Sequence, residues 1–141
     1  VQTCALPIYG ERISVSKAAG LDQAMIGCGF YYDRDQMMQA TLDTVGELFR
    51  QNIHGIRRCG AAALDLAYVA AGWFEGFFEY RLSPWDIAAG AVLVQEAGGK
   101  VTDCAGEKVP LNRSSTLCAS NARIHEALLE IVGSRAPKQV V

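Results

Sequence analysis

One aspartate, placed at the start of a long apolar segment, could bind a cation. In the segment RLSPWDIAAG (81–90), no charged residue follows Asp86 until Glu96. A carboxylate at the mouth of a buried helix is poorly hydrated and needs a partner such as a cation. Mg²⁺ suits this position, since proteins usually hold it by one or two carboxylates together with phosphate and water oxygens. Asp86 is therefore a candidate Mg²⁺ ligand.

The same residue fits a structural role. Ser83, Pro84 and Asp86 have the spacing of a helix N-cap, a first-turn proline and an acidic third residue, which is a variant of the capping box. From spacing alone, helix caps are commoner than metal sites. Both interpretations stay open on the sequence.

Two further features could share a site with Asp86. Glu79 lies seven residues earlier at the end of an aromatic segment, and the following turn would bring it to the same sheet edge. A solvated strand end is the alternative. In RRCGAA (57–62), Gly60 lets the backbone approach a ligand, and Ala61 and Ala62 begin a helix whose first N–H groups are unpaired. These residues could bind an anion or a hydroxyl, although glycine before a helix is common.

The elements that must position these residues alternate between strands and helices. Apolar alternation or short apolar runs predict strands at 11–16, 24–32, 73–80, 100–104 and 116–120. Helical spacing of apolar residues predicts helices at 35–51, 57–72, 84–96 and 124–132, the last capped by Ser120 or Asn121. The second and third helices are apolar on most sides, which predicts burial. This alternation indicates an α/β layered fold.

Composition excludes several classes of protein. The 141 residues are 50% hydrophobic and 20% charged with a net charge of −2, as in a single globular domain without a basic surface for nucleic acid. Five cysteines and two histidines lack metal-ligand spacing, which predicts reduced thiols in a cytoplasmic protein and no zinc site. No apolar run approaches the roughly 18 residues of a membrane span.

Three segments carry a family resemblance. GAAALDLAYVAAG, GFFEY and PWDIAAGAVLVQEAGG together resemble the C-terminal half of the inositol monophosphatase family, from about Gly10 to Ile131. The most specific part is W-D-x-A-A-G…E-A-G-G, from Trp85 to Gly99, which combines an aspartate, a helix of small residues and two glycines. The resemblance implies the layered α/β C-terminal half of the inositol monophosphatase or sugar phosphatase fold. It also implies Mg²⁺-dependent hydrolysis of inositol monophosphate or a similar small polyol or sugar phosphate.

The resemblance assigns roles by position. It implies that Asp86 is a catalytic Mg²⁺ ligand, that Glu79 hydrogen-bonds a hydroxyl of the substrate alcohol, and that Gly60, Ala61 and Ala62 line the substrate pocket. Many relatives carry Ser or Thr where this chain has Ala61, so the pocket lacks a hydroxyl and the resemblance does not fix the preferred alcohol. Trp73 stands where related bacterial sequences often carry Arg, at the surface.

The family's other metal ligands, an acidic pair and a D-P-x-D-G-T type loop, do not occur in this chain. We therefore expect an inactive fragment of a phosphatase. The resemblance implies that the full-length form is a homodimer. We expect residues 1–8 to be a non-native leader, because VQTCALPI resembles translated adapter sequence. Residues 9–133 are then the phosphatase part and residues 134–141 a polar tail.

Alternatives remain at the level of substrate and of function. Within the superfamily these are a fructose bisphosphatase, a histidinol phosphatase or a nucleotide bisphosphate phosphatase. Outside enzymes, the chain could be a non-catalytic partner of the transcription machinery. Either way we expect no direct contact with nucleic acid and no membrane.

Overall fold

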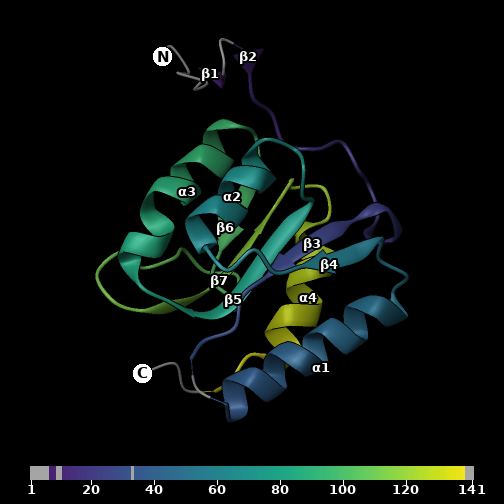
Figure 1. Cartoon of the computed structure of the whole chain (residues 1–141), viewed down its shortest axis with the longest axis vertical. Helices are drawn as coiled ribbons and strands as arrows, with labels where there is room; N and C mark the ends of the chain where they lie inside the picture. Colours follow the sequence, from purple (N-terminus) through teal and green to yellow (C-terminus); the bar gives the residue numbers. More distant parts are fainter. Residues whose placement is uncertain (1–6, 9–10, 33, 139–141) are drawn as a thin grey trace.

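A five-stranded mixed sheet forms the centre of the protein. The computed structural model describes residues 7–8, 11–32 and 34–138. The strand order is β4-β3-β5-β7-β6 (Figure 1). β3 runs parallel to both β4 and β5, whereas β7 is antiparallel to β5 and β6. The bounds are Met25–Cys28 (β3), Gly55–Arg57 (β4), Gly76–Leu82 (β5), Lys100–Thr102 (β6) and Ser115–Ser120 (β7).

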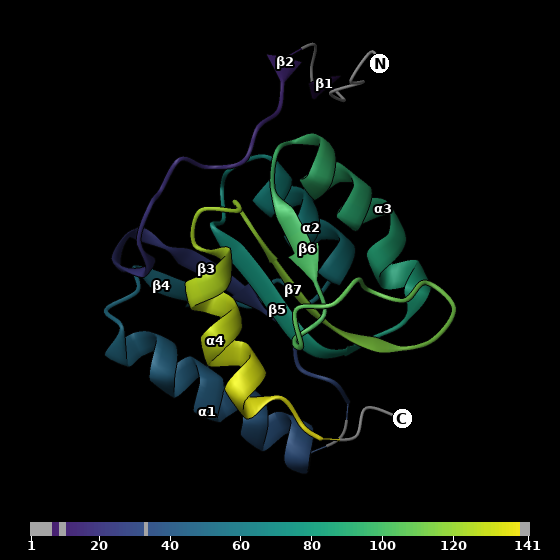
Figure 2. The same cartoon turned by 180° about the vertical axis from the view of Figure 1, so that it is seen from behind.

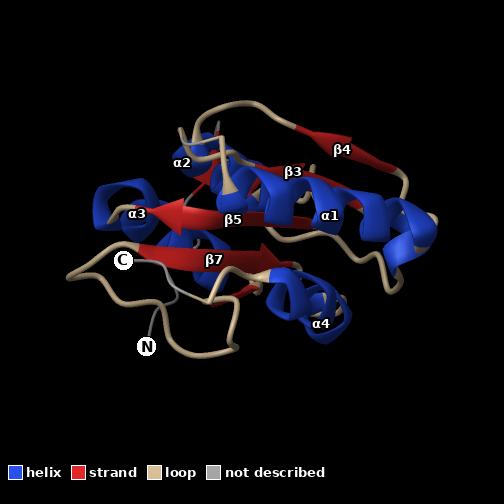
Figure 3. Ribbon diagram, turned by 90° about the horizontal axis from the view of Figure 1, so that it is seen from below, coloured by secondary structure: helices blue, strands red, loops and turns tan. Residues whose placement is uncertain are grey.

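Four helices cover the sheet in two layers. Helices α1 (Gln36–Arg50) and α4 (His125–Arg135) lie on one face, and α2 (Ala62–Ala70) and α3 (Pro84–Glu96) lie on the other (Figures 1 and 2). Seen from below, the sheet lies between the layers (Figure 3). The α/β layered fold predicted from the sequence is confirmed.

Each face of the sheet has its own hydrophobic core, because side chains alternate between the faces along a strand. On β5, Phe78 and Tyr80 pack against Leu48 of α1 and Leu128 of α4. The intervening Phe77 packs in a second cluster. That cluster also contains the following buried residues of the α2/α3 layer and the sheet: Leu66, Val69, Ile87, Val94 and Leu117. Glu79 has the same parity as Phe77 and therefore lies on the α2/α3 face.

Small residues let α2 and α3 pack closely. A Cβ atom on Gly90 of α3 would lie 2.5 Å from Cδ1 of Leu66, which is closer than carbon atoms can approach. Gly76 in β5 shows a similar approach, with Cδ2 of Leu128 2.7 Å from the position of a Cβ.

Several predicted boundaries were wrong. The helix predicted at 57–72 begins only at Ala62, because Gly55–Arg57 pair with β3 as a strand that the sequence analysis missed. The strand predicted at 73–80 is shifted to Gly76–Leu82, with a register shift between Glu79 and Leu82. The strand predicted at 11–16 is reduced to β2 (Glu11–Arg12), which pairs with β1 (Pro7–Ile8). A short 3-10 helix, Leu21–Gln23, precedes β3.

Helices α2 and α3 are less buried than predicted. Leu64 of α2 is 45% exposed and Val92 of α3 is 53% exposed, so each helix has an outward apolar side. The predicted cap of the last helix was wrong, because the N-cap residue of α4 is Ile124, which makes no side-chain cap. Oδ1 of Asn121 instead accepts hydrogen bonds from the N–H groups of Arg123 and Ile124 in the turn before α4.

The predicted division of the chain into a leader, a phosphatase part and a tail stays a prediction. Residues 1–6 of the predicted leader and residues 139–141 of the predicted tail lie outside the described residues, and α4 extends to Arg135. None of the helices in the described ranges is long and apolar enough to cross a membrane.

Candidate functional site

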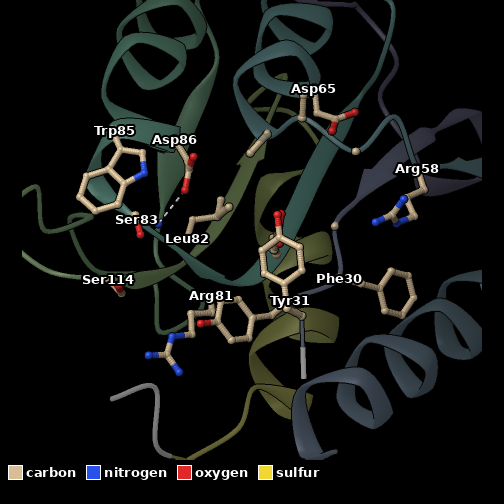
Figure 4. Close-up of a pocket in the computed structure, with 16 residues that line it drawn as sticks. Phe30, Tyr31, Arg58, Asp65, Arg81, Leu82, Ser83, Trp85, Asp86 and Ser114 are labelled. Carbon is tan, nitrogen blue, oxygen red and sulfur yellow. Dashed lines mark hydrogen bonds between the residues drawn. The ribbon is translucent and has the colours of Figure 1, made fainter. Parts of the chain in front are cut away.

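A cavity of about 580 Å³ opens where β4, β3 and β5 end (Figure 4). Because these strands are parallel, their carboxyl ends meet at one edge of the sheet, the usual place for a ligand in α/β proteins. The lining comes from the loops after β3 and β4, from the end of β5 and from the start of α3. The residues used below are Gly29, Tyr31, Arg58, Gly60, Ala61, Ala62, Asp65, Glu79, Arg81, Ser83, Trp85 and Asp86. Every site residue predicted from the sequence therefore lines one cavity.

Asp86 has the capping geometry and also faces the cavity. Its Oδ2 accepts a hydrogen bond from the N–H of Ser83 at 3.0 Å, as part of a capping box with Pro84 in the first turn (Figure 4, dashed line). This bond uses one carboxylate oxygen and leaves Oδ1 for another ligand. The two interpretations of Asp86 are therefore compatible, since the cap fixes the carboxylate at the cavity wall. Trp85 beside it is 81% exposed.

Glu79 is a perturbed carboxylic acid. Burial, followed by repulsion from Asp86 and from Asp65, raises its pKa from 4.5 to about 7, although Arg58 acts in the opposite direction. Its side chain is half-buried on the α2/α3 face of β5. At neutral pH this carboxyl group is therefore present in both protonation states, so it can accept or donate a hydrogen bond. Glu79 is therefore less solvated than the end of an exposed strand, and its role in substrate binding stays a prediction.

The residues before α2 form a backbone cradle. Gly60 adopts a φ of +89°, which is in the left-handed region that favours glycine. Ala61 is the N-cap residue of α2 and makes no side-chain cap, because alanine offers no acceptor. The first N–H groups of α2 are thus available to an anion or a hydroxyl oxygen in the cavity.

Asp65 is a site residue that the sequence analysis did not assign. It lies in the first turn of α2, is only 1% exposed, and lines the cavity. Its Oδ1 has no hydrogen-bond partner among the described residues. Burial raises the pKa of this carboxyl group, whereas a hydrogen bond from Cys59 and the charge of Arg58 lower it. The signal in the sequence was a single charge within an otherwise apolar helix.

Arg81 and Tyr31 complete the rim. The guanidinium carbon of Arg81 lies 4.7 Å from the centre of the Tyr31 ring, a cation–π contact. Together with Arg58, this arginine places two positive charges around three carboxyl groups. The cavity therefore combines cationic groups, carboxyl groups and free N–H donors, a set suited to a ligand that carries both phosphate and hydroxyl groups.

The family model for the inositol monophosphatase family matches residues 4–136. The chain belongs to the inositol monophosphatase family. Solved structures of similar proteins support the fold. The inositol monophosphatase of Anabaena superposes with a TM-score of 0.80 at 35% identity, over 90% of this chain and 49% of that one. The SuhB protein of Bartonella henselae gives a TM-score of 0.79 at 35% identity, over 93% and 47%.

Among curated relatives, the Nus factor SuhB of Pseudomonas aeruginosa is 44% identical over 133 residues, which are 92% of this chain and 48% of that protein. The chloroplastic phosphatase IMPL1 of Arabidopsis thaliana is 42% identical over 86% of this chain and 32% of that protein. The chain therefore spans half or less of the length of these relatives.

Membership of the family implies a bound metal ion, and the donor set of the cavity fits one in part. Asp86 presents a carboxylate oxygen, and the repulsion between Asp86 and Glu79 is of the kind that a cation offsets. Within the described residues, no group of three or more His, Cys, Asp and Glu side chains could hold a metal ion. Asp86 is the described residue to which we assign a ligand role, and the other ligands would be phosphate, water or side chains from elsewhere.

Proposed function

We propose that this chain forms the substrate-binding side of a Mg²⁺-dependent phosphomonoesterase that hydrolyses inositol monophosphate or a similar small polyol or sugar phosphate. The observation that carries the proposal is that Asp86, Glu79 and the start of α2 meet in one cavity. The residues that implied this function in the sequence come from three separate elements, yet they line the same space.

In the proposed mechanism, Asp86 would hold Mg²⁺ through Oδ1 while Oδ2 remains bonded to Ser83. A bound Mg²⁺ would neutralise phosphoryl charge and lower the pKa of a coordinated water molecule. The capping box orients the carboxylate, so that the ligand is preorganised by the helix that carries it.

Glu79 would bind the alcohol. Its carboxyl group, with a pKa near 7, can accept a hydrogen bond from a substrate hydroxyl when ionised, or donate one when protonated. The N–H groups at the start of α2 would contact another oxygen of the same ligand. Arg58, on the loop before α2, contributes positive charge that favours an anionic substrate. These residues bind and orient the substrate rather than attack it.

The 141-residue chain should release no phosphate by itself, because one metal-ligating carboxylate cannot clamp both the attacking and the leaving oxygen. Activity is expected from a full-length protein that also contains the acidic pair and loop described above. In the same proposal that protein is a cytoplasmic homodimer.

Substitution of Asp86 tests the proposal. In the full-length protein, Asp86→Asn should lower Mg²⁺-dependent release of phosphate from inositol monophosphate on the order of a hundredfold, since a metal-held charge contributes several kcal/mol. Glu96→Gln is a matched control, because Glu96 is an exposed acid at the other end of α3. Equal Mg²⁺ affinity of Asp86→Asn and the unsubstituted protein, measured by calorimetry, would refute the metal role.

The substrate of the full-length protein can be identified by comparing kcat/KM over a panel of phosphomonoesters. Fructose bisphosphate, histidinol phosphate and a nucleotide bisphosphate represent the other enzymes of the superfamily, and the preferred ester is the one with the highest kcat/KM. A preference for any of these over inositol monophosphate would correct the substrate and leave the reaction class unchanged.

A second candidate function is supported by the relative named Nus factor SuhB, at 44% identity. On this proposal the protein acts as a partner of the transcription machinery, and the cavity is dispensable for that role. The two functions separate if Asp86→Asn abolishes phosphate release but leaves the cellular role intact. The expectation that the chain does not itself contact nucleic acid stays a prediction.

A further inference from the structure

Gly29 lies directly beside Glu79 on the neighbouring strand. The parallel register pairs Ile26 with Gly76 and Cys28 with Phe78, and the N–H of Gly29 continues this ladder by donating to the carbonyl of Phe78 at 3.2 Å. Residues in matching register on parallel strands present their side chains to the same face of the sheet. A side chain at position 29 would therefore share a face with Glu79.

The carboxylate of Glu79 occupies the space where that side chain would be. A Cβ atom built on Gly29 would lie 1.9 Å from Oε2, 2.3 Å from Cδ and 2.8 Å from Oε1 of Glu79. All three distances are below van der Waals contact, so the carboxyl group of Glu79 occupies the space that a side chain at Gly29 would need.

The backbone itself does not require glycine at this position. Gly29 is not among the glycines with positive φ, so an L-amino acid could adopt its backbone conformation. Gly27, two residues earlier, is a useful contrast, because a Cβ there would meet the core rings of Phe77 and Phe74 at 3.1 and 3.2 Å. Gly27 of β3 makes room for hydrophobic packing, and Gly29, directly after β3, makes room for a carboxyl group at the cavity.

We infer that Gly29 is a positioning residue, which holds the carboxyl group of Glu79 against the end of β3 so that it faces the alcohol of the substrate. The approach of Glu79 to Gly29 is independent of the proposed function, whereas its consequence for the substrate rests on that function. In this position Glu79 is surrounded by Asp86 from α3, Asp65 from α2, Arg58 from the loop before α2 and Cys28 from β3. A displaced carboxyl group would leave this environment for the open part of the cavity.

Gly29→Ala tests the inference without any assay of activity. In the 141-residue chain, the pKa of Glu79 can be followed from the ¹³C shift of its carboxyl carbon with EDTA present. We expect the substitution to move that pKa from about 7 towards 4.5, because burial is the main cause of the raised value. The control is Gly20→Ala, since a Cβ at Gly20 would also meet a flexible carboxylate, Oδ1 of Asp22 at 2.4 Å, but outside the cavity.

Thermal unfolding separates positioning from misfolding. Gly29→Ala should unfold cooperatively at nearly the same temperature as Gly20→Ala. An unchanged titration of Glu79 in a folded Gly29→Ala protein would overturn the inference. If Gly29→Ala does not fold, Glu79→Asp replaces it. The shorter side chain should lose the contact with Gly29 and titrate near 3.8, the ordinary pKa of an aspartate, whereas a pKa that stays raised well above 3.8 would overturn the inference.

A double-mutant cycle in the full-length protein tests the functional consequence. Gly29→Ala and Glu79→Gln should each lower kcat/KM for inositol monophosphate about tenfold or more, as expected for loss of one hydrogen bond to a charged group. The double variant should be no worse than Glu79→Gln alone, because both changes remove the same interaction. Additive losses would show that Gly29 acts independently of Glu79 and would overturn the inference.

The proposed function can fail while the positioning role stands. This is the outcome if neither the unsubstituted protein nor any variant releases phosphate, but Gly29→Ala still shifts the titration of Glu79.

Discussion

Buried polar groups are paired on the α1/α4 face of the sheet and incompletely paired on the α2/α3 face. On the first face, the Tyr80 hydroxyl donates to the carbonyl of Val132 at 2.9 Å and also bonds the hydroxyl of Thr44. The ring of His125 bonds Thr102 at 3.0 Å and Ser120 at 2.9 Å. These groups are fully buried and satisfied, as expected for polar groups that stabilise a fold.

The second face departs from this rule at the cavity. Oδ1 of Asp65 has no partner among the described residues, and the pKa of Glu79 is raised to about 7. Buried groups that lack partners cost stability, so a fold retains them where they serve a ligand. The incompletely paired groups therefore lie at the cavity on the α2/α3 face, where we propose that the ligand binds.

The largest expected effect is an opposite response of the two faces to acid. Below pH 6.5 the unfolded chain protonates His125, whereas burial and Lys100 keep the folded histidine neutral to about pH 4, so stability falls as pH falls through this range. Glu79 acts in reverse, because its folded pKa of about 7 exceeds the ordinary 4.5, and stability rises as pH falls between these values. The histidine alone corresponds to roughly 3 kcal/mol.

Denaturant unfolding at a series of pH values in EDTA checks this expectation. Glu79→Gln should make the loss of stability between pH 6.5 and 4.5 steeper, and His125→Gln should reverse its sign. His54→Gln is the control, because His54 is exposed. Parallel pH profiles for all these proteins would contradict the proposed difference between the faces.

An intermediate effect is expected from removing the buried hydroxyl of the paired face. Tyr80→Phe should lower the free energy of unfolding by about 2 kcal/mol, because two buried hydrogen bonds are lost. Tyr31→Phe, at the cavity rim, keeps the ring beside Arg81 and should change stability by less than about 0.5 kcal/mol. Urea unfolding, analysed with one m-value for the two variants and the unsubstituted protein, measures both changes in the free energy of unfolding. A smaller loss for Tyr80→Phe than for Tyr31→Phe would remove the distinction between a structural and a functional face.

The sequence predicted the helices better than the strands. Helices α1, α3 and α4 have strong local signals: apolar spacing, the Ser83–Pro84 start and the glycine pair after α3. β4 was missed because three residues carry too little periodicity, and Gly55–Arg57 form a strand only by pairing with β3. Tertiary pairing, not local propensity, therefore sets the start of α2.

The site was predicted in part for a similar reason. Glu79 and Asp86 are close in sequence, so one turn predicts that they meet. Gly29 lies fifty residues before Glu79, and their contact follows from the order β3-β5 in the sheet, which the sequence does not reveal. Asp65 was visible as a lone charge in an apolar helix, but its unpaired oxygen depends on the packing around it.

The smallest expected effect is a gain of stability from neutralising Asp65, whose Oδ1 has no hydrogen-bond partner among the described residues. Asp65→Asn should raise the free energy of unfolding by about 1 kcal/mol at neutral pH, because an amide buried at this site costs less than an ionised carboxylate. Burial raises the folded pKa of Asp65 above 3.8, so the cost of its charge appears as pH rises, and the gain should vanish in acid. Asp43→Asn, on the exposed side of α1, should show no such gain. A loss of stability at neutral pH would mean that Asp65 is a paired, structural group. A gain that is accompanied by weaker substrate binding would show that the fold retains an unfavourable charge because the site uses it.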